Sequence, residues 1–458
     1  VGFCCTSVYF GNEVHFVKKH LRIFLACLCT LLCCALLAGC TLALPGAQPQ
    51  SSTAPAAQQS SLVAFSSLSQ NISEAGYYNT LYTGDAKHTI YLLSLYDFSE
   101  MQHRVLCEKE GCTHTDGTCD AYLQASTLVA RPGALYAICP RYFIDPADES
   151  GLADFVAMDE NGQNHRTLST ISDNWTFTGA DEQYLYGFCE DAFGRISLSD
   201  GTETYLLRNA RGKFLFWGKI AGVWDGRFVT VHWGDATRAE GVEIGLLSPE
   251  GVYTLLGTVP QGTFLSYSGS VLMGDTLYYI DSSNGTVMSF ALDAGETHEV
   301  STALCQYDRD EGQGFHSCQR WYLSTANNAL LAMVYGADEA SGDIWKESLY
   351  HIDISTGAAN PLSLKQEYRN KSSEAEMADG HGWGEPGFVT PLAETQQGLF
   401  VVSAYEFYMD SYLDENGQKV EYETSRPVYA LISAEDYLSG TPNLSLIHIS
   451  EPTRRSYI

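Results

Sequence analysis

Two turn-and-strand signatures that recur at near-regular intervals constrain the fold of this chain more than any other feature. The first is a turn of Gly, Asp or Asn followed by a short aromatic or aliphatic run, as at residues 274–279. Its strand centres fall near residues 135, 185, 228, 277, 330 and 399, at intervals of 50, 43, 49, 53 and 69 residues. Gly and Asn suit tight turns, and aromatic and β-branched side chains favour strands. The chain is therefore expected to consist mainly of short strands.

The second signature follows the first in each unit and predicts how the strands connect. It is an apolar run that ends in Asp or Ser and is followed by a Gly turn and another strand, as at residues 350–357. Asp and Ser side chains can hydrogen-bond the turn backbone, so these turns are expected to join neighbouring antiparallel strands. A repeat of this length with about four strands per unit is typical of a β-propeller.

The number of repeats predicts the number of blades. Six clear units and a partial one at residues 77–107 favour an all-β propeller of seven or eight four-stranded blades. A polar, Gly-rich insertion at residues 363–388 accounts for the longest interval. Each blade buries its faces only against its neighbours, so a closed ring of many copies is needed for stability. A β-sandwich is the alternative, but it would lack the regular spacing and the paired signature.

The N-terminal region has the features of an export signal. Basic residues at 17–22 precede fifteen apolar residues at 23–37, which are too few to span a bilayer. The run ends in Leu37-Ala-Gly-Cys40, which resembles the bacterial lipobox. We therefore interpret residues 1–39 as upstream read-through plus a lipoprotein signal peptide, with Val17 as an alternative start. Cys40 becomes the first mature residue, acylated on its thiol by chains such as palmitate. A plain secretory signal or a buried core helix is the alternative.

Composition divides the rest of the chain into a tether, a folded body and a tail. Residues 40–72 are rich in Ser, Ala, Gln and Pro, which predicts a lipidated Cys followed by a flexible linker to the lipid bilayer. Residues 73–443 form the expected propeller. Residues 444–458 begin with an eleven-residue run that looks like a translated sequencing adaptor, so we interpret them as an artefact and expect the native protein to continue beyond Asn443. A native amphipathic tail is the alternative.

The most specific motif is a cluster of three cysteines and one histidine within thirteen residues. We call Cys107, Cys112, His114 and Cys119 the Cys3His group; their spacing is C-x4-C-x-H-x4-C. Zinc accepts such a ligand set in tetrahedral geometry. Two of the thiols could instead form a disulfide, because an exported chain meets oxidising conditions, or all three could stay reduced. In each case the motif is expected to staple a loop between blades, not to form an active site.

A family resemblance rests on this motif and its setting. The Cys3His group, followed by Ala121-Tyr122, lies after a lipobox and before propeller-type repeats. In this order the chain resembles lipoproteins of gut Firmicutes. The resemblance implies a β-propeller held outside the cytoplasm on the bacterial cell membrane by a lipid anchor, and it implies no mechanism.

Charge and motif searches narrow the possible functions. The formal net charge of −29 excludes a nucleic-acid binder that works through a basic field. The sequence has no G-x-S-x-G, H-E-x-x-H or G-x4-G-K-[ST] motif, and we assign no catalytic residue. Two weaker sites remain. Asp308, Asp310 and Glu311 could hold Ca²⁺, although a solvated turn is the simpler interpretation. His381 and Trp383, in the insertion, could line a ligand face, although an exposed loop is the simpler interpretation.

These features favour a non-catalytic binding or protein-interaction module at the bacterial surface. Its expected partners are the lipid bilayer, through acylated Cys40, and a glycan or an exported protein. The alternative is a propeller-type carbohydrate hydrolase or lyase that uses paired carboxylates. A third hypothesis is a subunit that docks other exported proteins in envelope maintenance. Zinc and calcium are the only cofactors that the motifs suggest.

Overall fold

The computed structural model describes most of the chain between residues 61 and 449. The gaps are residues 66–68, 86–87, 113, 115–117, 146, 209–217, 234–240, 260–268, 282–284, 305–319, 338–344, 372–385 and 414–417. The chain divides into the units Val1–Gln58 and Gln59–Ile458, and all described residues belong to the second. In the part described, no helix has the length and apolar character needed to cross a membrane.

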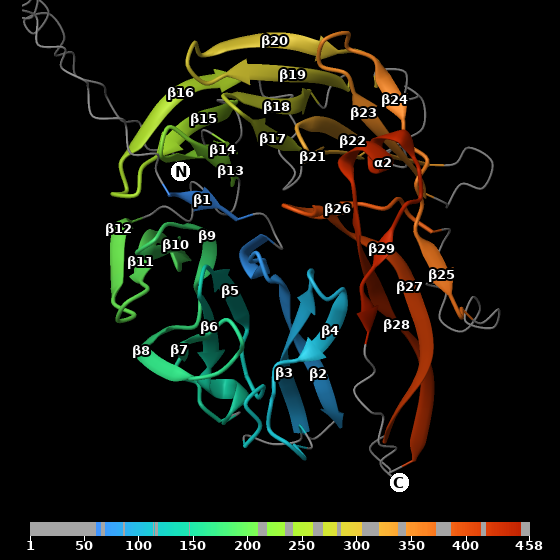
Figure 1. Cartoon of the computed structure of the whole chain (residues 1–458). Coiled ribbons are helices and arrows are strands. Elements are labelled where there is room, and N and C mark those ends of the chain that lie inside the picture. Colours follow the sequence, from blue (N-terminus) through green and yellow to red (C-terminus); the bar gives the residue numbers. More distant parts are fainter. Residues whose placement is uncertain are drawn as a thin grey trace, which may run out of the picture. The chain divides into compact units, whose positions relative to one another are not determined.

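The second unit is a ring of seven β-sheets that follow one another in chain order (Figure 1). The first three sheets take their strands as follows. Blade 1 comprises β2 (Gly76–Asp85), β3 (His88–Asp97), β4 (Gln102–Val105) and β30 (His448–Ile449). Blade 2 comprises β5 (Thr127–Arg131), β6 (Ala134–Pro140), β7 (Leu152–Asp159) and β8 (Arg166–Ser172). Blade 3 comprises β9 (Thr176–Ala180), β10 (Tyr184–Cys189), β11 (Ala192–Ser197) and β12 (Glu203–Leu207), with β1 (Val63–Ala64) added beside β9.

The other four sheets repeat the same order of strands. Blade 4 comprises β13 (Gly218–Trp224), β14 (Arg227–Trp233), β15 (Val242–Leu247) and β16 (Tyr253–Val259). Blade 5 comprises β17 (Ser270–Met273), β18 (Thr276–Asp281), β19 (Thr286–Ala291) and β20 (Glu296–Ser301). Blade 6 comprises β21 (Arg320–Ala326), β22 (Ala329–Ala337), β23 (Trp345–Ile352) and β24 (Ala359–Pro361). Blade 7 comprises β26 (Pro391–Thr395), β27 (Gly398–Leu413), β28 (Lys419–Ile432) and β29 (Ser445–Leu446), with β25 (Glu367–Arg369) paired in parallel to β27.

Helical segments are few and short in the described residues. They are the 3-10 turns η1 (Ser69–Asn71) and η2 (Arg141–Phe143) and the α-helix α2 (Ala434–Ser439). Ser433 caps α2 by accepting a hydrogen bond from the backbone N–H of Asp436, and Gly440 ends it in the left-handed conformation that favours glycine. The described body is therefore an all-β propeller, as the sequence predicts.

The ring is held by seven apolar clusters, one between each pair of neighbouring blades. Successive side chains of a strand point to opposite faces of its sheet, so a strand inside a blade can contribute to two clusters. In β5, Leu128 packs toward blade 1 and Val129 toward blade 3. In β18, Leu277 packs toward blade 4 and Tyr278 toward blade 6. Each sheet is therefore buried on both faces, which a single blade could not achieve alone.

The seventh cluster closes the ring between blades 7 and 1. Tyr77 of blade 1 lies against Phe400 and Tyr429 of blade 7, with ring centroids 5.3 and 5.6 Å apart. Ile447 is buried in the same cluster, between the short strands β29 on blade 7 and β30 on blade 1. Ile447 and the strands β29 and β30 all lie within residues 444–458.

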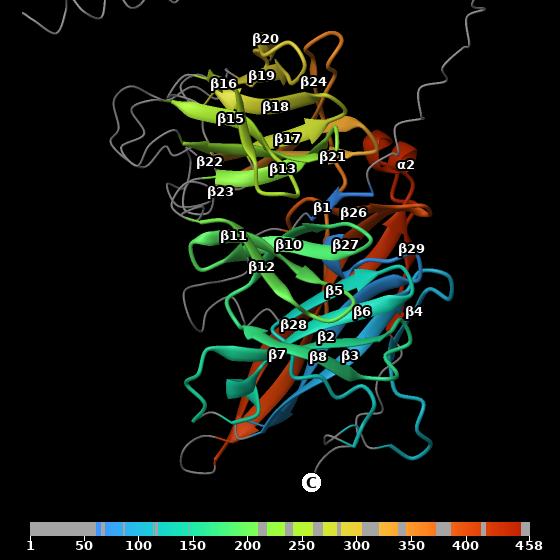
Figure 2. The same cartoon turned by 90° about the vertical axis from the view of Figure 1, so that its left-hand side faces the viewer.

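The repeat signatures map onto fixed positions in the blades. The first signature forms the second strand, as in β18 and β22, and the second forms the third strand and the turn after it, as in β23. The partial unit at residues 77–107 contains most of β2 and all of β3 and β4 of blade 1. The longest hairpin, β27–β28, runs well past the short outer strands of its sheet (Figure 2). Seven blades are present, within the predicted range of seven or eight.

Candidate metal centre

The Cys3His group lies on a loop that leaves the edge of blade 1 and returns to the same edge. Strand β4 ends at Val105, and the backbone N–H of Leu106 still bonds the carbonyl of Leu93 in β3. The chain then turns outward and comes back at Ala121, whose carbonyl accepts a hydrogen bond from the N–H of Leu93 at 2.7 Å. The N–H of Leu123 bonds the carbonyl of Tyr91 at 2.9 Å. Both ends of the loop are thus fixed on β3.

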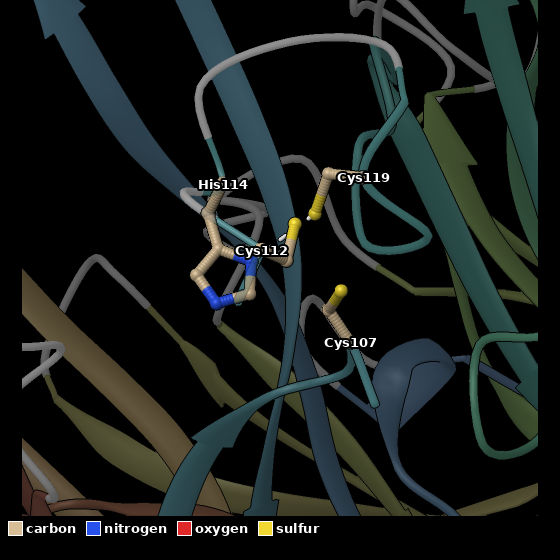
Figure 3. Close-up of side chains that lie close together, drawn as sticks. All are labelled: Cys107, Cys112, His114 and Cys119. Carbon is tan, nitrogen blue, oxygen red and sulfur yellow. Dashed lines mark hydrogen bonds between the residues drawn. The ribbon is translucent and has the colours of Figure 1, made fainter. Parts of the chain in front are cut away.

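Tight turns inside the loop bring the four side chains together. Gly111 has φ 73°, and His114 has φ 56°, which is uncommon for a residue with a side chain. The backbone N–H of Cys112 bonds the carbonyl of Lys109 at 3.1 Å. As a result, the ligand atoms of the Cys3His group all lie within 4.8 Å of one another (Figure 3). His114 Nδ1 lies 3.2 Å from Cys119 Sγ.

Backbone amides aim at two of the sulfur atoms. Burial raises the pKa of the Cys107 thiol, but N–H donors from Lys109 and Asp120, together with hydrogen bonds from the other two thiols, lower its pKa below the usual value. Burial raises the pKa of the Cys119 thiol to about 12, although the N–H of Ala121 also points to it. Three crowded sulfur atoms cannot all carry negative charge without a cation among them.

A lysine and an aspartate close the loop from the outside. Lys109 Nζ lies 2.6 Å from Asp120 Oδ1, and it also donates a hydrogen bond to the carbonyl of Thr118. The pKa of Lys109 is raised, chiefly by the bond to Asp120. Both residues adjoin cysteines in the sequence or in space, so a positive charge lies beside the sulfur cluster. Sequence reasoning did not single out this pair, although the i and i+11 spacing across the loop could have suggested it.

The donor set fits zinc. Three sulfur atoms and one imidazole nitrogen complete a tetrahedral shell, and N–H···S bonds are the outer contacts that orient thiolate ligands. Four protein ligands leave no open position for a substrate, which is the arrangement of structural zinc sites. A disulfide between any two of the thiols would leave the third thiol and the imidazole beside it. Of the other described cysteines, Cys139 is buried in the same apolar cluster as Cys119 but is not among the four grouped ligand atoms, and Cys189 is buried in the next cluster.

Several predicted site residues fall in parts of the chain that the structure does not describe. They are the lipidation residue Cys40, the calcium candidates Asp308, Asp310 and Glu311, and the ligand-face candidates His381 and Trp383. Cys305 and Cys318 also lie outside the described residues. The four members of the Cys3His group are therefore the predicted site residues that the structure describes, and it brings all four together.

Taken together, the fold and this site define a class: a seven-bladed β-propeller with a candidate metal centre on a loop of its first blade. No protein-family model matches the sequence, and no curated protein matches it. Among solved structures, an oligogalacturonate lyase in complex with manganese is 13% identical with a TM-score of 0.38, over 76% of this chain and 96% of that one.

Two further solved structures have a similar level of likeness. The GH74 enzyme of Niastella koreensis is 11% identical with a TM-score of 0.38, over 82% of this chain and 67% of that one. A protein from Lactobacillus plantarum is 9% identical with a TM-score of 0.36, over 85% of this chain and 95% of that one. Likeness at this level carries no functional argument, so the function has to be argued from this chain's own residues.

Proposed function

We propose that the Cys3His group binds a structural Zn²⁺ ion in a surface-anchored β-propeller that acts as a binding module. The observation that carries the zinc proposal is the convergence of three sulfur atoms and one nitrogen within 4.8 Å. A metal at this point would add a cross-link between four side chains of a thirteen-residue loop whose ends are fixed on β3 and whose interior is held by Lys109. Cross-linking a loop reduces the conformational freedom that folding must overcome.

The charges around the loop support a divalent cation. Zinc with three thiolates and a neutral imidazole carries a net charge of −1, and Lys109 stands next to it as a partner of opposite sign. Cys119 is buried and its thiol is hard to ionise alone, so the ion would also remove the penalty for placing a thiolate there. The same loop without metal would keep Cys119 mainly as a thiol, because burial raises its pKa.

The proposed role outside the cytoplasm is supported by the sequence. The lipobox that ends at Cys40 and the linker of residues 40–72 would tether the propeller to the bilayer while leaving it free to turn. The propeller would then bind a glycan or an exported protein rather than catalyse a reaction, with the zinc loop keeping blade 1 rigid. The overall charge of −29 would keep such a body away from an anionic membrane surface.

Metal analysis of the purified full chain tests the zinc proposal. We expect one zinc ion per chain, and we expect Cys112→Ser and His114→Ala each to lower the zinc content to well below one. Cys139→Ser is the matched control, because Cys139 is buried in β6 and is not a member of the group. The proposal is wrong if the wild type lacks zinc and thiol titration under denaturing conditions finds a disulfide within residues 107–119.

Fractionation and binding assays test the proposed location and role. Wild-type protein is expected in the membrane fraction, and Cys40→Ser is expected in the soluble extracytoplasmic fraction. Glycan arrays and pull-downs with the full chain in detergent are expected to find a ligand that is recovered unchanged. Cleavage of a captured glycan would instead favour the carbohydrate hydrolase or lyase, and membrane retention of Cys40→Ser would contradict the anchor.

A further inference from the structure

A half-buried positive charge, that of Lys219, lies between blades 4 and 5, far in the sequence from the Cys3His group. Lys219 is in β13 and Ser270 begins β17, the first strands of their blades. These strands lie on the inner side of the ring, whereas β16 and β20 lie on its outer side (Figure 1). Lys219 pairs with Val231 of β14, and Val231 packs in the cluster shared with blade 5. Directly opposed residues share a face, so Lys219 also faces blade 5.

The ammonium group of Lys219 has unused hydrogen-bonding capacity. Its Nζ donates to the backbone carbonyl of Ser270, which is its one hydrogen bond with the described part of the chain. An ammonium has three N–H donors, so two of them have no protein acceptor there. Among the described residues no charged neighbour contributes to its titration, and desolvation lowers the pKa of Lys219 to about 8. A cation taken out of water without a carboxylate partner is costly for the folded protein.

The hydroxyl group of Ser270 is a second unused donor at the same place. Ser270 is 1% exposed, and its Oγ atom has no hydrogen-bond partner among the described residues. A buried polar atom without a partner also destabilises the fold. Two such groups on neighbouring residues of adjacent blades, Lys219 and Ser270, point to a ligand that both could bind.

We propose that Lys219 and Ser270 form a binding site for a carboxylate group of a small ligand on the inner side of blades 4 and 5. The ammonium would supply charge-assisted N–H donors, and the serine would supply an O–H donor to the second carboxylate oxygen. A carboxylate carries one negative charge, which one lysine balances. A phosphate carries nearly two and would meet a chain of net charge −29, so we assign the site to carboxylates. Organic acids and acidic sugars share this group.

The site does not depend on the zinc ion or on the lipid anchor. The carboxylate site adds a ligand class to the binding role proposed above, and it is tested independently of that role. Both residues were absent from the sequence-based candidates, because they lie 51 residues apart and meet only through the packing of two blades.

NMR of the full chain with ¹³C-labelled lysine tests the proposal at the residue itself. The Lys219 resonance is assigned by its loss in Lys219→Gln. Acetate and glucuronate are then titrated, with glucose as the neutral match for glucuronate and inorganic phosphate as the competing anion. We expect saturable shifts of the Lys219 resonance with acetate and glucuronate, none with glucose, and weaker binding of phosphate. Lys419, an exposed lysine paired with Glu421 at 2.6 Å, serves as the control resonance and should not saturate.

The serine variant separates a binding site from a buried structural lysine. Ser270→Ala should keep the thermal melting temperature of the wild type or raise it, since it removes an unpartnered hydroxyl, and should weaken acetate binding about tenfold. The proposal is wrong if neither carboxylate shifts the Lys219 resonance saturably, if phosphate binds more tightly than both, or if Ser270→Ala binds acetate as the wild type does. A loss of zinc or of membrane attachment would leave these results unchanged.

Discussion

The imidazole of His114 and the thiol of Cys119 meet at 3.2 Å between Nδ1 and Sγ, although four residues separate them in the sequence. This distance fixes which nitrogen of His114 faces the sulfur atoms and therefore which one would bind a metal. Nδ1 of His114 and the three sulfur atoms lie close together, so protons and a metal ion compete for the same four side chains. Disulfide formation would compete for the three thiols.

Zinc retention should fall as the pH is lowered. Zinc binds thiolates and neutral imidazole, so every proton on the Cys3His group competes with the ion. The pKa of Cys119 is raised to about 12 without metal, so this thiol must release a proton when zinc binds. We expect the apparent zinc affinity to decrease steadily from pH 8 to pH 5 in a competition assay with a chromogenic chelator. An affinity that does not change with pH would contradict coordination by these thiols.

Removing the charge of Lys109 should weaken zinc binding and leave the fold intact. Lys109→Met keeps the aliphatic stem but loses the ion pair with Asp120 and the bond to Thr118. Lys109 is exposed, so we expect no resolvable change in the melting temperature. Its charge lies beside an anionic metal centre, so zinc should dissociate several-fold faster. Lys419→Met, which breaks a similar exposed pair with Glu421, is the control and should not alter zinc release.

The sequence predicted the fold because the strand pattern and the turn chemistry agree with the packing. The second signature places Asp353 before a Gly turn, and in the structure its Oδ1 accepts hydrogen bonds from Ser355 N at 2.9 Å and Ser355 Oγ at 2.7 Å. The number of blades was less certain from sequence, because blade 7 contains the long hairpin β27–β28 and lacks a clear second signature.

The metal centre could be predicted only as a set of residues. Spacing alone grouped the four side chains but left zinc, a disulfide and free thiols open, and the exported setting favoured the disulfide. Whether the four side chains can share a metal depends on where the loop returns to blade 1. That position is set by the pairing of Ala121 and Leu123 with β3, which no local sequence pattern predicts. The proposed carboxylate site could not be predicted for the same reason. Lys219 and Ser270 come together only because blades 4 and 5 pack against each other.

The turn held by Asp353 should make stability depend on pH in acid. Its bonds to the side chains of Ser355 and Thr356, and to their backbone N–H groups, lower the pKa of Asp353 to about 2. A carboxyl with a depressed folded-state pKa stabilises the fold above its unfolded pKa of about 4, and this contribution is lost as the pH falls toward 2. The difference in urea midpoint between wild type and Asp353→Ala should therefore be largest above pH 5 and vanish near pH 2. A difference that grows on acidification would contradict this role.

A buried hydroxyl links α2 to the interior of blade 7. Tyr437 is 1% exposed, and its hydroxyl donates a 2.9 Å hydrogen bond to the carbonyl of Val389. Tyr437→Phe keeps the ring but leaves that carbonyl without its donor, so we expect a loss of about 1–2 kcal/mol in the free energy of unfolding. Tyr142→Phe, at a side chain that is 43% exposed, is the control and should change it by less than about 0.5 kcal/mol. Equal effects of the two variants in urea unfolding would contradict the assignment.

Ring closure should depend on Phe400 more than on any exposed residue. Phe400 is fully buried between blades 7 and 1, and its ring lies 5.3 Å from Tyr77 and 5.0 Å from Tyr429, centroid to centroid. Phe400→Ala removes the contact that joins the last blade to the first, so we expect a loss of about 3–5 kcal/mol in the free energy of unfolding. Leu255→Ala, at a site that is 50% exposed, is the control. Because the ring shares one set of interfaces, unfolding should stay cooperative. A Phe400→Ala variant as stable as Leu255→Ala would mean that the packing of blade 7 against blade 1 does not stabilise the ring.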